Sequence, residues 1–344
     1  MLSTSDPISS FITANVTGGT NDPDTFPDGT TIGEFVDNDE HGAIDYRIRQ
    51  LSYSSLLTLH SCPRKFQLYK LKTKFKDPES EESNITFAYG HVVGQGIQDI
   101  LSGLSMREVL WKLFLGWHAD FAAEDSKNKS ITSAIIALMK FKSMRDQGFL
   151  SDWEVVIYNG KPACELSFCI NLPDGFRLRG YVDVVLRNKV TGAVMVLELK
   201  TTGKASFSPS EYKNSAQAIG YSIVLDVLFP EISSYEVLYL IYQSKSQEYT
   251  PITFSKSYLQ RALWIKELLL DIEMIKLYEK SECYPMRGES CFNYYRDCTY
   301  INSCQMSTDI LTGPLTVKDV DVTEYQINLS LLDLVNAQLS KVGE

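Results

Sequence analysis

The segment LRGYVDVVLRNKVTGAVMVLELK, residues 178–200, decides the fold of this chain. Two runs rich in β-branched residues flank a polar turn, which is the pattern of a β-hairpin. When the turn is centred between Val190 and Thr191, Asp183 is predicted to lie directly opposite Glu198. The segment therefore predicts two carboxylates facing each other on neighbouring strands.

The second strand of this hairpin is apolar apart from Glu198 and Lys200. Side chains two residues apart share one face of a strand, so this pair projects together while Leu197 and Leu199 point to the other face. Burying a charge costs several kcal/mol unless the charge is paired or binds a metal. The two charged residues therefore need a partner or a function.

Directly opposed Cβ atoms lie about 4.5–5.5 Å apart on antiparallel strands. Two carboxylates at that distance repel and raise each other's pKa unless a cation lies between them. Hard oxygen ligands suit Mg²⁺ or Mn²⁺. A solvated ion pair is the alternative for Glu198 and Lys200 taken alone, but Asp183 on the facing strand favours a metal site.

The composition is that of a globular protein. The chain has 344 residues, of which 44% are hydrophobic and 22% charged, which leaves room for a large core and excludes a fibrous or wholly disordered protein. No apolar run reaches the roughly 18 residues of a membrane span. The start, MLSTSDPISSFITANV, has no basic region and no long apolar core, so no secretory signal is predicted and a cytoplasmic location is expected.

The net charge of −10 is unevenly distributed. Residues 1–45 hold nine acidic residues and no Lys or Arg, which leaves 34 acidic against 33 basic residues in the remainder. A nearly neutral body can carry local basic strips, and KLKTKFK, residues 70–76, has four lysines. This stretch is either a contact for phosphate groups or a solvated helix end.

Helices are predicted before the hairpin. Residues 1–45 form an acidic tail without apolar periodicity and are predicted to be disordered. Helical spacing begins near Leu51, and Pro63 either divides the first helix or opens a second one. Three amphipathic helices are predicted at 87–104, 105–121 and 131–148, with Ser105 as the cap of the second.

Strands and helices are predicted in alternation after residue 150. Strands occupy 153–200, a helix 211–229, a buried strand 234–243 and a long helix 256–280. This order predicts an α/β fold with a mixed central β-sheet flanked by helices. Four regions follow: the tail at 1–45, a helical insertion at 46–150, an α/β core at 151–280 and a cysteine-rich segment at 281–344.

Gln217 and Tyr221 lie four residues apart in the helix predicted after the hairpin. They share one helical face and could reach a phosphate at the end of the strand that carries Glu198 and Lys200. An ordinary half-buried pair is the alternative, because short patterns of this kind are common.

These motifs together resemble the PD-(D/E)xK nuclease superfamily. They are Asp183 in GYVDVV, Glu198 and Lys200 in LELKTT, Gln217 and Tyr221 in QAIGY, and the preceding CPRKF at 62–66. Within the superfamily the chain is most similar to the RecB-type branch, which includes phage exonucleases and CRISPR-adaptation nucleases. The resemblance covers roughly residues 51–304 and implies that 151–280 form a restriction-endonuclease-like nuclease core.

The resemblance implies cleavage of DNA phosphodiester bonds that depends on Mg²⁺ or Mn²⁺. The leading hypothesis is a DNA exonuclease of recombination, repair or processing, for which a phage is one source. The alternatives are a catalytically inactive nucleic-acid-binding or scaffold protein that keeps the fold, and a DNA endonuclease. DNA is the expected partner, with recombination or replication proteins beside it; no membrane is expected, and the oligomeric state is left open.

The resemblance also implies roles for individual residues. Asp183 and Glu198 match the metal-binding acids, with the main-chain carbonyl of Leu199 as a further ligand. Lys200 matches the lysine that orients or activates the attacking water and stabilises charge on the phosphoryl group, and a lysine is a movable point charge suited to that role. The residues matched to substrate positioning are Gln217 and Tyr221.

The chain departs from the family in its helical motif. Relatives often carry a metal-binding His four residues after a Gly, whereas here Gly94 holds that place and His91 directly follows Gly90. His91 is either a metal ligand, or a capping or core histidine. Glu165 in CELSFCI resembles the acid on the first strand of some relatives, and it is either an extra ligand or a structural charge partner.

Four of the seven cysteines lie in the last 62 residues. Cys164 and Cys169 fall in a predicted strand and are expected to be inert core residues. Many RecB-type relatives hold a [4Fe–4S] cluster with one early and three late cysteines, and the resemblance assigns this arrangement to Cys62, Cys291, Cys298 and Cys304. The usual Cys-x2-Cys pair is absent, because six residues separate Cys291 from Cys298, so zinc or simple reduced thiols remain alternatives.

Overall fold

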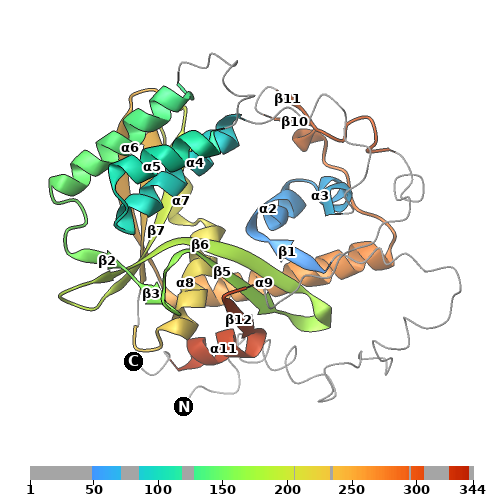
Figure 1. Cartoon of the computed structure of the whole chain (residues 1–344). Coiled ribbons are helices and arrows are strands. Elements are labelled where there is room, and N and C mark those ends of the chain that lie inside the picture. Colours follow the sequence, from blue (N-terminus) through green and yellow to red (C-terminus); the bar gives the residue numbers. More distant parts are fainter. Residues whose placement is uncertain are drawn as a thin grey trace, which may run out of the picture.

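The computed structural model describes residues 49–70, 85–117, 128–204, 206–232, 235–293, 296–305 and 325–340. Helices cover both faces of one mixed sheet (Figure 1). The predicted fold class is therefore confirmed. The acidic segment 1–45 and most of KLKTKFK lie outside the described residues, and their roles stay predictions.

The central sheet has the strand order β12-β5-β6-β7-β8-β9, with β1 and β2 both paired to β6. Its strands are β1 (Gln50–Ser52), β2 (Trp153–Val155), β5 (Cys164–Asn171), β6 (Arg177–Asn188), β7 (Val194–Thr202), β8 (Tyr235–Gln243), β9 (Glu248–Lys256) and β12 (Ile327–Ser330). The β1–β6, β12–β5 and β7–β8 pairs are parallel, and the other pairs are antiparallel. Two small hairpins stand apart, β3 (Ile157–Tyr158) with β4 (Lys161–Pro162) and β10 (Phe292–Asn293) with β11 (Arg296–Asp297).

The β6–β7 hairpin has the register predicted from the sequence. Val184 pairs with Leu197, so the next residues toward the open end of the hairpin are Asp183 and Glu198. At the closed end, the side chain of Asn188 accepts hydrogen bonds from the N–H groups of Val190 and Thr191, both at 2.9 Å. A short polar side chain that bonds to its own turn fixes the turn and with it the register.

The two faces of β7 pack against different helices, because successive side chains alternate across a strand. Leu197 and Leu199 face α4 (Ile85–Leu101), α5 (Met106–Gly116) and α6 (Ile131–Asp146). Val194 and Val196 belong to the opposite core, formed with α8 (Ala216–Leu228), α9 (Tyr258–Lys280) and α11 (Leu331–Leu339). A strand buried on both faces needs the nearly continuous apolar run that this segment has.

Two predicted helix starts are confirmed. Ser105 caps α5 in a reciprocal capping box, in which its N–H donates to the Glu108 carboxylate at 2.9 Å. Helix α2 (Tyr53–Ser61) ends just before Pro63, which is the first residue of α3 (Pro63–Lys70). Proline is tolerated there because the first helical N–H has no partner within the helix.

The prediction of a single helix at 211–229 is wrong in one respect, because the structure has two helices there. A short helix α7 (Ser210–Lys213) is separated from α8 by Asn214 and Ser215. The carbonyl of Lys213 accepts a hydrogen bond at 2.6 Å from the fully buried ammonium of Lys256 on β9. The Lys213 carbonyl therefore has a hydrogen-bond partner from β9 at the residue where α7 ends.

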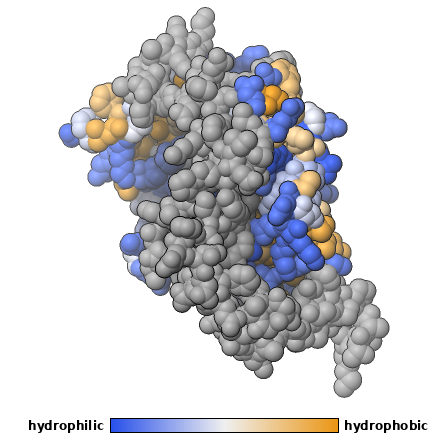
Figure 2. Space-filling view, turned by 90° about the vertical axis from the view of Figure 1, so that its right-hand side faces the viewer, coloured by the Kyte–Doolittle hydropathy of each residue, from blue (hydrophilic) through white to orange (hydrophobic). Residues whose placement is uncertain are grey.

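The first helices of the described chain lie beside the cysteine-rich segment. The N–H of Arg64 donates to the carbonyl of Pro285 at 3.1 Å, and its guanidinium donates to the carbonyl of Cys304 at 3.1 Å. Ser290 donates to the carbonyl of Ser61 at 2.7 Å. Where described residues are visible on this side of the molecule, hydrophilic and hydrophobic residues alternate (Figure 2). These hydrogen bonds fix α2 and α3 to the cysteine-rich segment.

None of the helices in the described ranges has the length and apolarity that crossing a membrane would require. The longest described helix, α9, contains eight charged residues among its 23.

Candidate active site

Asp183 and Glu198 lie next to each other at the open end of the β6–β7 hairpin, as the register requires. The carboxylate of Asp183 accepts a hydrogen bond at 3.0 Å from the backbone N–H of Leu199. Glu198 is only 1% exposed, and it lies on the face of β7 that α8 covers. The hairpin alone therefore brings together one buried and one half-buried acid.

Lys200 links these acids to helix α8. Its ammonium lies 2.6 Å from a carboxylate oxygen of Glu198 and donates a hydrogen bond to Gln217 at 3.1 Å. The amide of Gln217 in turn donates to the hydroxyl of Tyr221 at 2.5 Å. Glu198, Lys200, Gln217 and Tyr221 thus form one connected polar chain, which brings together the four residues singled out on β7 and α8.

Burial changes the protonation of these groups. The pKa of Asp183 is raised well above its ordinary value, first by burial and then by the charge of Glu198. Burial also raises the pKa of Glu198, although the ammonium of Lys200 opposes that shift. The pKa of Lys200 is raised because the attraction of Glu198 and Asp183 exceeds the opposing effect of burial. The lysine is therefore held in its charged form.

Glu165 is the third acid of the site. On β5, Cys164 pairs with Val184 and Leu166 with Val182, so Glu165 stands across from Asp183. Its backbone has a φ of +49°, a left-handed conformation that is uncommon for residues other than glycine. The charge of Glu165 contributes to the raised pKa of both Asp183 and Glu198. Three acids from three adjacent strands therefore interact electrostatically.

Gln98 on α4 is a site residue that the sequence analysis did not identify. It is only 3% exposed, and its amide donates a hydrogen bond to the carboxylate of Glu165 at 2.8 Å. The feature of the sequence that could have identified Gln98 is its position, eight residues after Gly90 on the buried face of α4. The same helix approaches β7 closely, since a Cβ on Gly90 would lie 3.2 Å from the hydroxyl of Thr201.

The donor groups of the site suit a hard divalent cation. Neither buried oxygen of Glu198 accepts a well-aligned hydrogen bond from a described residue, and its close contact is the ion pair with Lys200. Mg²⁺ in proteins keeps several waters and binds one or two carboxylates. Asp183 and Glu198 can supply those carboxylates. Glu165 lies across from Asp183 on the neighbouring strand, and Leu199, with its main-chain carbonyl, directly follows Glu198 on β7. Within the described ranges, no three His, Cys, Asp or Glu side chains are already arranged as a metal-binding group.

His91 is not joined to the acids. It lies exposed on α4, and no hydrogen bond or ion pair within the described ranges connects it to Asp183, Glu198 or Glu165. Its role as a ligand stays a prediction that the geometry does not favour.

The four cysteines assigned together by resemblance do gather near one another. Burial raises the pKa of Cys304, and the neighbouring thiols of Cys62, Cys298 and Cys291 raise it further, against the opposing charge of Arg64. All four are free thiols, and Cys62 is buried. Cys169 is a buried residue of β5, as expected, whereas Cys164 is half-buried and contacts Ser102.

Comparison with known proteins gives one family. The profile of the PD-(D/E)XK nuclease superfamily matches residues 50–305. A solved structure of a candidate exonuclease from Eubacterium rectale is 11% identical, with 80% of this chain and 92% of that chain covered and a TM-score of 0.41. The structure of SSO0001 is 14% identical, with 70% and 81% covered and a TM-score of 0.28. No curated protein matches the chain. The family match spans all three strands that carry the acids.

Proposed function

Because the chain belongs to the PD-(D/E)XK nuclease superfamily, we propose that it is a metal-dependent exonuclease that hydrolyses phosphodiester bonds in DNA. The observation that carries this proposal is the pairing of Asp183 with Glu198 beside the ammonium of Lys200. An inactive relative has no reason to keep Glu198 buried and Asp183 half-buried beside it, since two carboxylates close together cost stability. The superfamily membership supports phosphodiester hydrolysis; DNA, metal dependence and attack from an end are the parts that we propose.

Asp183 and Glu198 hold Mg²⁺ or Mn²⁺ in this proposal. The ion, when bound, lowers the pKa of a coordinated water and neutralises charge on the phosphoryl group. The backbone N–H of Leu199 keeps the Asp183 carboxylate directed at this position. Glu165, held by Gln98, adds a third negative charge that favours a divalent cation over a monovalent one.

Lys200 acts as a cation in this site. The charges of Glu198 and Asp183 raise the pKa of Lys200 against the lowering effect of burial, which favours its protonated form. Its three N–H donors can orient the attacking water and stabilise negative charge that develops on the phosphate oxygens. Gln217 accepts one of these donors and so fixes the direction of the ammonium.

The exonuclease activity and a role in recombination, repair or processing rest on the resemblance to the RecB-type branch. A role in recombination, repair or processing implies recombination or replication proteins as partners. A phage is one source of exonucleases of the RecB type. An endonuclease and a binding protein without activity are the competing outcomes of the test below.

The test compares linear DNA labelled at one end with covalently closed circular DNA, in Mg²⁺, in Mn²⁺ and in EDTA. We expect degradation of the linear DNA alone, lost in EDTA and in Asp183→Asn. Cleavage of the closed circle would instead establish an endonuclease. Stable binding without cleavage in either metal would establish the binding-protein alternative.

For the cysteine-rich segment we propose that Cys62, Cys291, Cys298 and Cys304 hold a [4Fe–4S] cluster, with zinc as the alternative. Cys62, Cys291 and Cys298 each influence the pKa of Cys304 and so lie near it, but no three of these thiols are already arranged as a metal-binding group within the described residues. Analysis of iron, acid-labile sulfide and zinc in anaerobically purified protein distinguishes the two metals, with Cys169→Ser as the matched control for Cys304→Ser. A folded protein that contains neither iron nor zinc would contradict both.

A further inference from the structure

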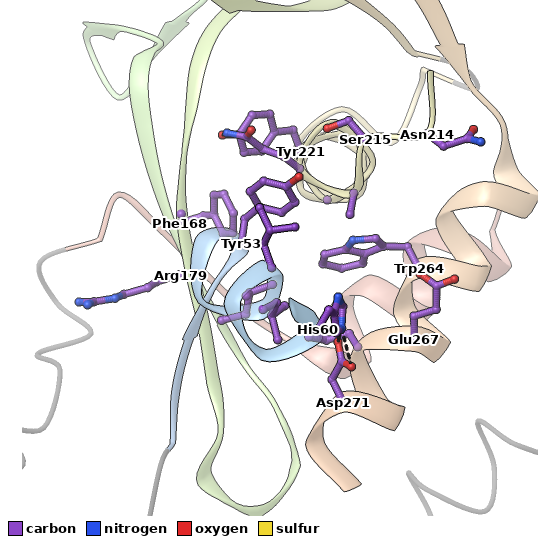
Figure 3. A pocket seen from close by; sticks show the side chains of 18 of the residues that line it. Tyr53, His60, Phe168, Arg179, Asn214, Ser215, Tyr221, Trp264, Glu267 and Asp271 are labelled. Atoms are coloured by element: carbon purple, nitrogen blue, oxygen red, sulfur yellow. Dashed lines mark hydrogen bonds and ion pairs between the residues drawn. The ribbon is translucent and has the colours of Figure 1, made fainter. Parts of the chain in front are cut away.

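A cavity of about 330 Å³ lies beside the polar chain of the active site (Figure 3). It is bounded by α2, by the β5–β6 pair, by the start of α8 and by α9. Its volume is within the range of small-molecule sites, about 300–1,000 Å³. The family motifs described above account for only two of its lining residues, Gln217 and Tyr221.

The cavity shares a wall with the catalytic residues. Gln217 and Tyr221 line it, and the same Gln217 accepts a hydrogen bond from Lys200 at 3.1 Å. Only the side chain of Gln217 therefore separates a group in the cavity from the Lys200 ammonium, which we expect to contact the scissile phosphate. Given the proposed function, the occupant is a part of the nucleotide next to that phosphate.

Four large aromatic side chains line the cavity. Tyr53 comes from α2 and Trp264 from α9, and Figure 3 shows them entering from different helices toward the space beneath the start of α8. Phe168 and Tyr221 meet edge to face at 6.3 Å between ring centroids and close the inner side. Flat aromatic surfaces bind nucleobases by stacking, which accepts any base because every base has a π-face.

The charges at the cavity disfavour a phosphate, because three carboxylates line it beside one arginine and one histidine. Glu211, Glu267 and Asp271 line it, and Asp271 pairs with His60 at 2.8 Å. The guanidinium of Arg179 is directed away, where it donates to the hydroxyl of Tyr325 at 3.3 Å (Figure 3). Carboxylates repel phosphate but accept hydrogen bonds from exocyclic amino groups such as N4 of cytosine.

We propose that this cavity binds the nucleobase of the terminal nucleotide, while its phosphate lies at Asp183, Glu198 and Lys200. The base stacks on Tyr53 and Trp264, and the carboxylates prefer bases that carry an amino group. This inference rests on the proposed function. It adds a reason for attack at ends, because a terminal base leaves its stack at a lower cost than an internal one.

The test is a double-mutant cycle between Tyr53 and the terminal base. Affinity for DNA is measured by fluorescence anisotropy in Ca²⁺ and in EDTA, and single-turnover cleavage in Mn²⁺. The substrates end in a normal cytosine or in an abasic nucleotide, and the variants are Tyr53→Ala and the matched control Tyr69→Ala, an exposed tyrosine on α3 outside the cavity. Leu57→Trp, at the exposed rim of the cavity, tests the effect of filling it.

We expect removal of the terminal base to weaken wild-type binding about tenfold, as loss of one stacked base does. Tyr53→Ala and Leu57→Trp should weaken binding of the intact end by a similar factor and leave the abasic end almost unaffected. Tyr69→Ala should change neither. A terminal thymine, which presents O4 in place of the amino group, should bind several-fold more weakly than cytosine.

Two results would overturn the assignment of the cavity: additive effects of Tyr53→Ala and base removal, or no effect of base removal on binding. If linear DNA is still cleaved in that case, the proposed function stands. A wild-type chain that neither binds nor cleaves any DNA end would overturn both.

Discussion

Asp183 and Glu198 face each other across the β6–β7 hairpin, and the same ladder that pairs Val184 with Leu197 determines this position. The fold thus places two like charges together in a buried site. Without a cation the arrangement costs stability, and that cost gives the first prediction.

In EDTA, the stability of the protein should fall as the pH rises from about 4 toward 8. Because the pKa of Asp183 is raised in the folded state by burial and by Glu198, its contribution is complete below the unfolded pKa of about 3.9 and is lost as the pH passes the raised value. Thermal melts in EDTA across this range check the slope. Asp183→Asn should flatten the slope and stabilise the metal-free protein at pH 8 by about 1 kcal/mol or more.

Addition of Mg²⁺ or Mn²⁺ at pH 8 should raise the melting temperature of the wild type, since a ligand that binds only the folded state stabilises it. Asp183→Asn should lose this increase. An equal increase in the variant would show that the ion binds elsewhere.

Lys200→Ala should lower the cleavage rate by at least about 100-fold, because a donor directed at developing charge is removed. Binding of Mn²⁺, measured by calorimetry, should remain or tighten, since the ammonium no longer competes for the Glu198 carboxylate. Lys204→Ala, which removes an exposed lysine just beyond β7, is the matched control. Unchanged cleavage in Lys200→Ala would contradict the site.

Gln98→Met should lower cleavage about tenfold with little change in fold, because groups that orient a metal ligand typically contribute 10–100-fold. The change removes the hydrogen bond to Glu165 and keeps the apolar part of the buried side chain. Gln95→Met on the exposed face of α4 should be neutral. Activity that is equal in both variants would show that Gln98 only fills space.

The stability of Lys256→Met relative to wild type should decrease between about pH 8 and 10.5. Burial lowers the pKa of Lys256 to about 8, so the folded state opposes its charge, and this penalty disappears as the lysine loses its proton. The shift corresponds to at most about 3 kcal/mol. Melts of both proteins, with the exposed Lys213→Met as control, measure it; a constant difference across this range would exclude the titration.

The hairpin and its acids could be predicted from the sequence, because alternation and the turn at Asn188 leave one register that buries the apolar side chains. Gln98 could not, since a glutamine on a buried helical face has no local pattern that distinguishes it. The break between α7 and α8 depends on Lys256, which is distant in sequence. The strained backbone of Glu165 and the gathering of the thiols likewise depend on contacts between remote segments.

Strand β12 is the last described strand, yet it pairs in parallel with β5, which carries Glu165. Helix α11 follows it, and its Gln338 bonds to the buried Asp226 of α8. The edge of the sheet and the support of α8 are therefore completed only after residues 327–339 have been synthesised, long after β5 and α8 themselves. A chain that stops before β12 lacks both elements, so we expect it to have no nuclease activity.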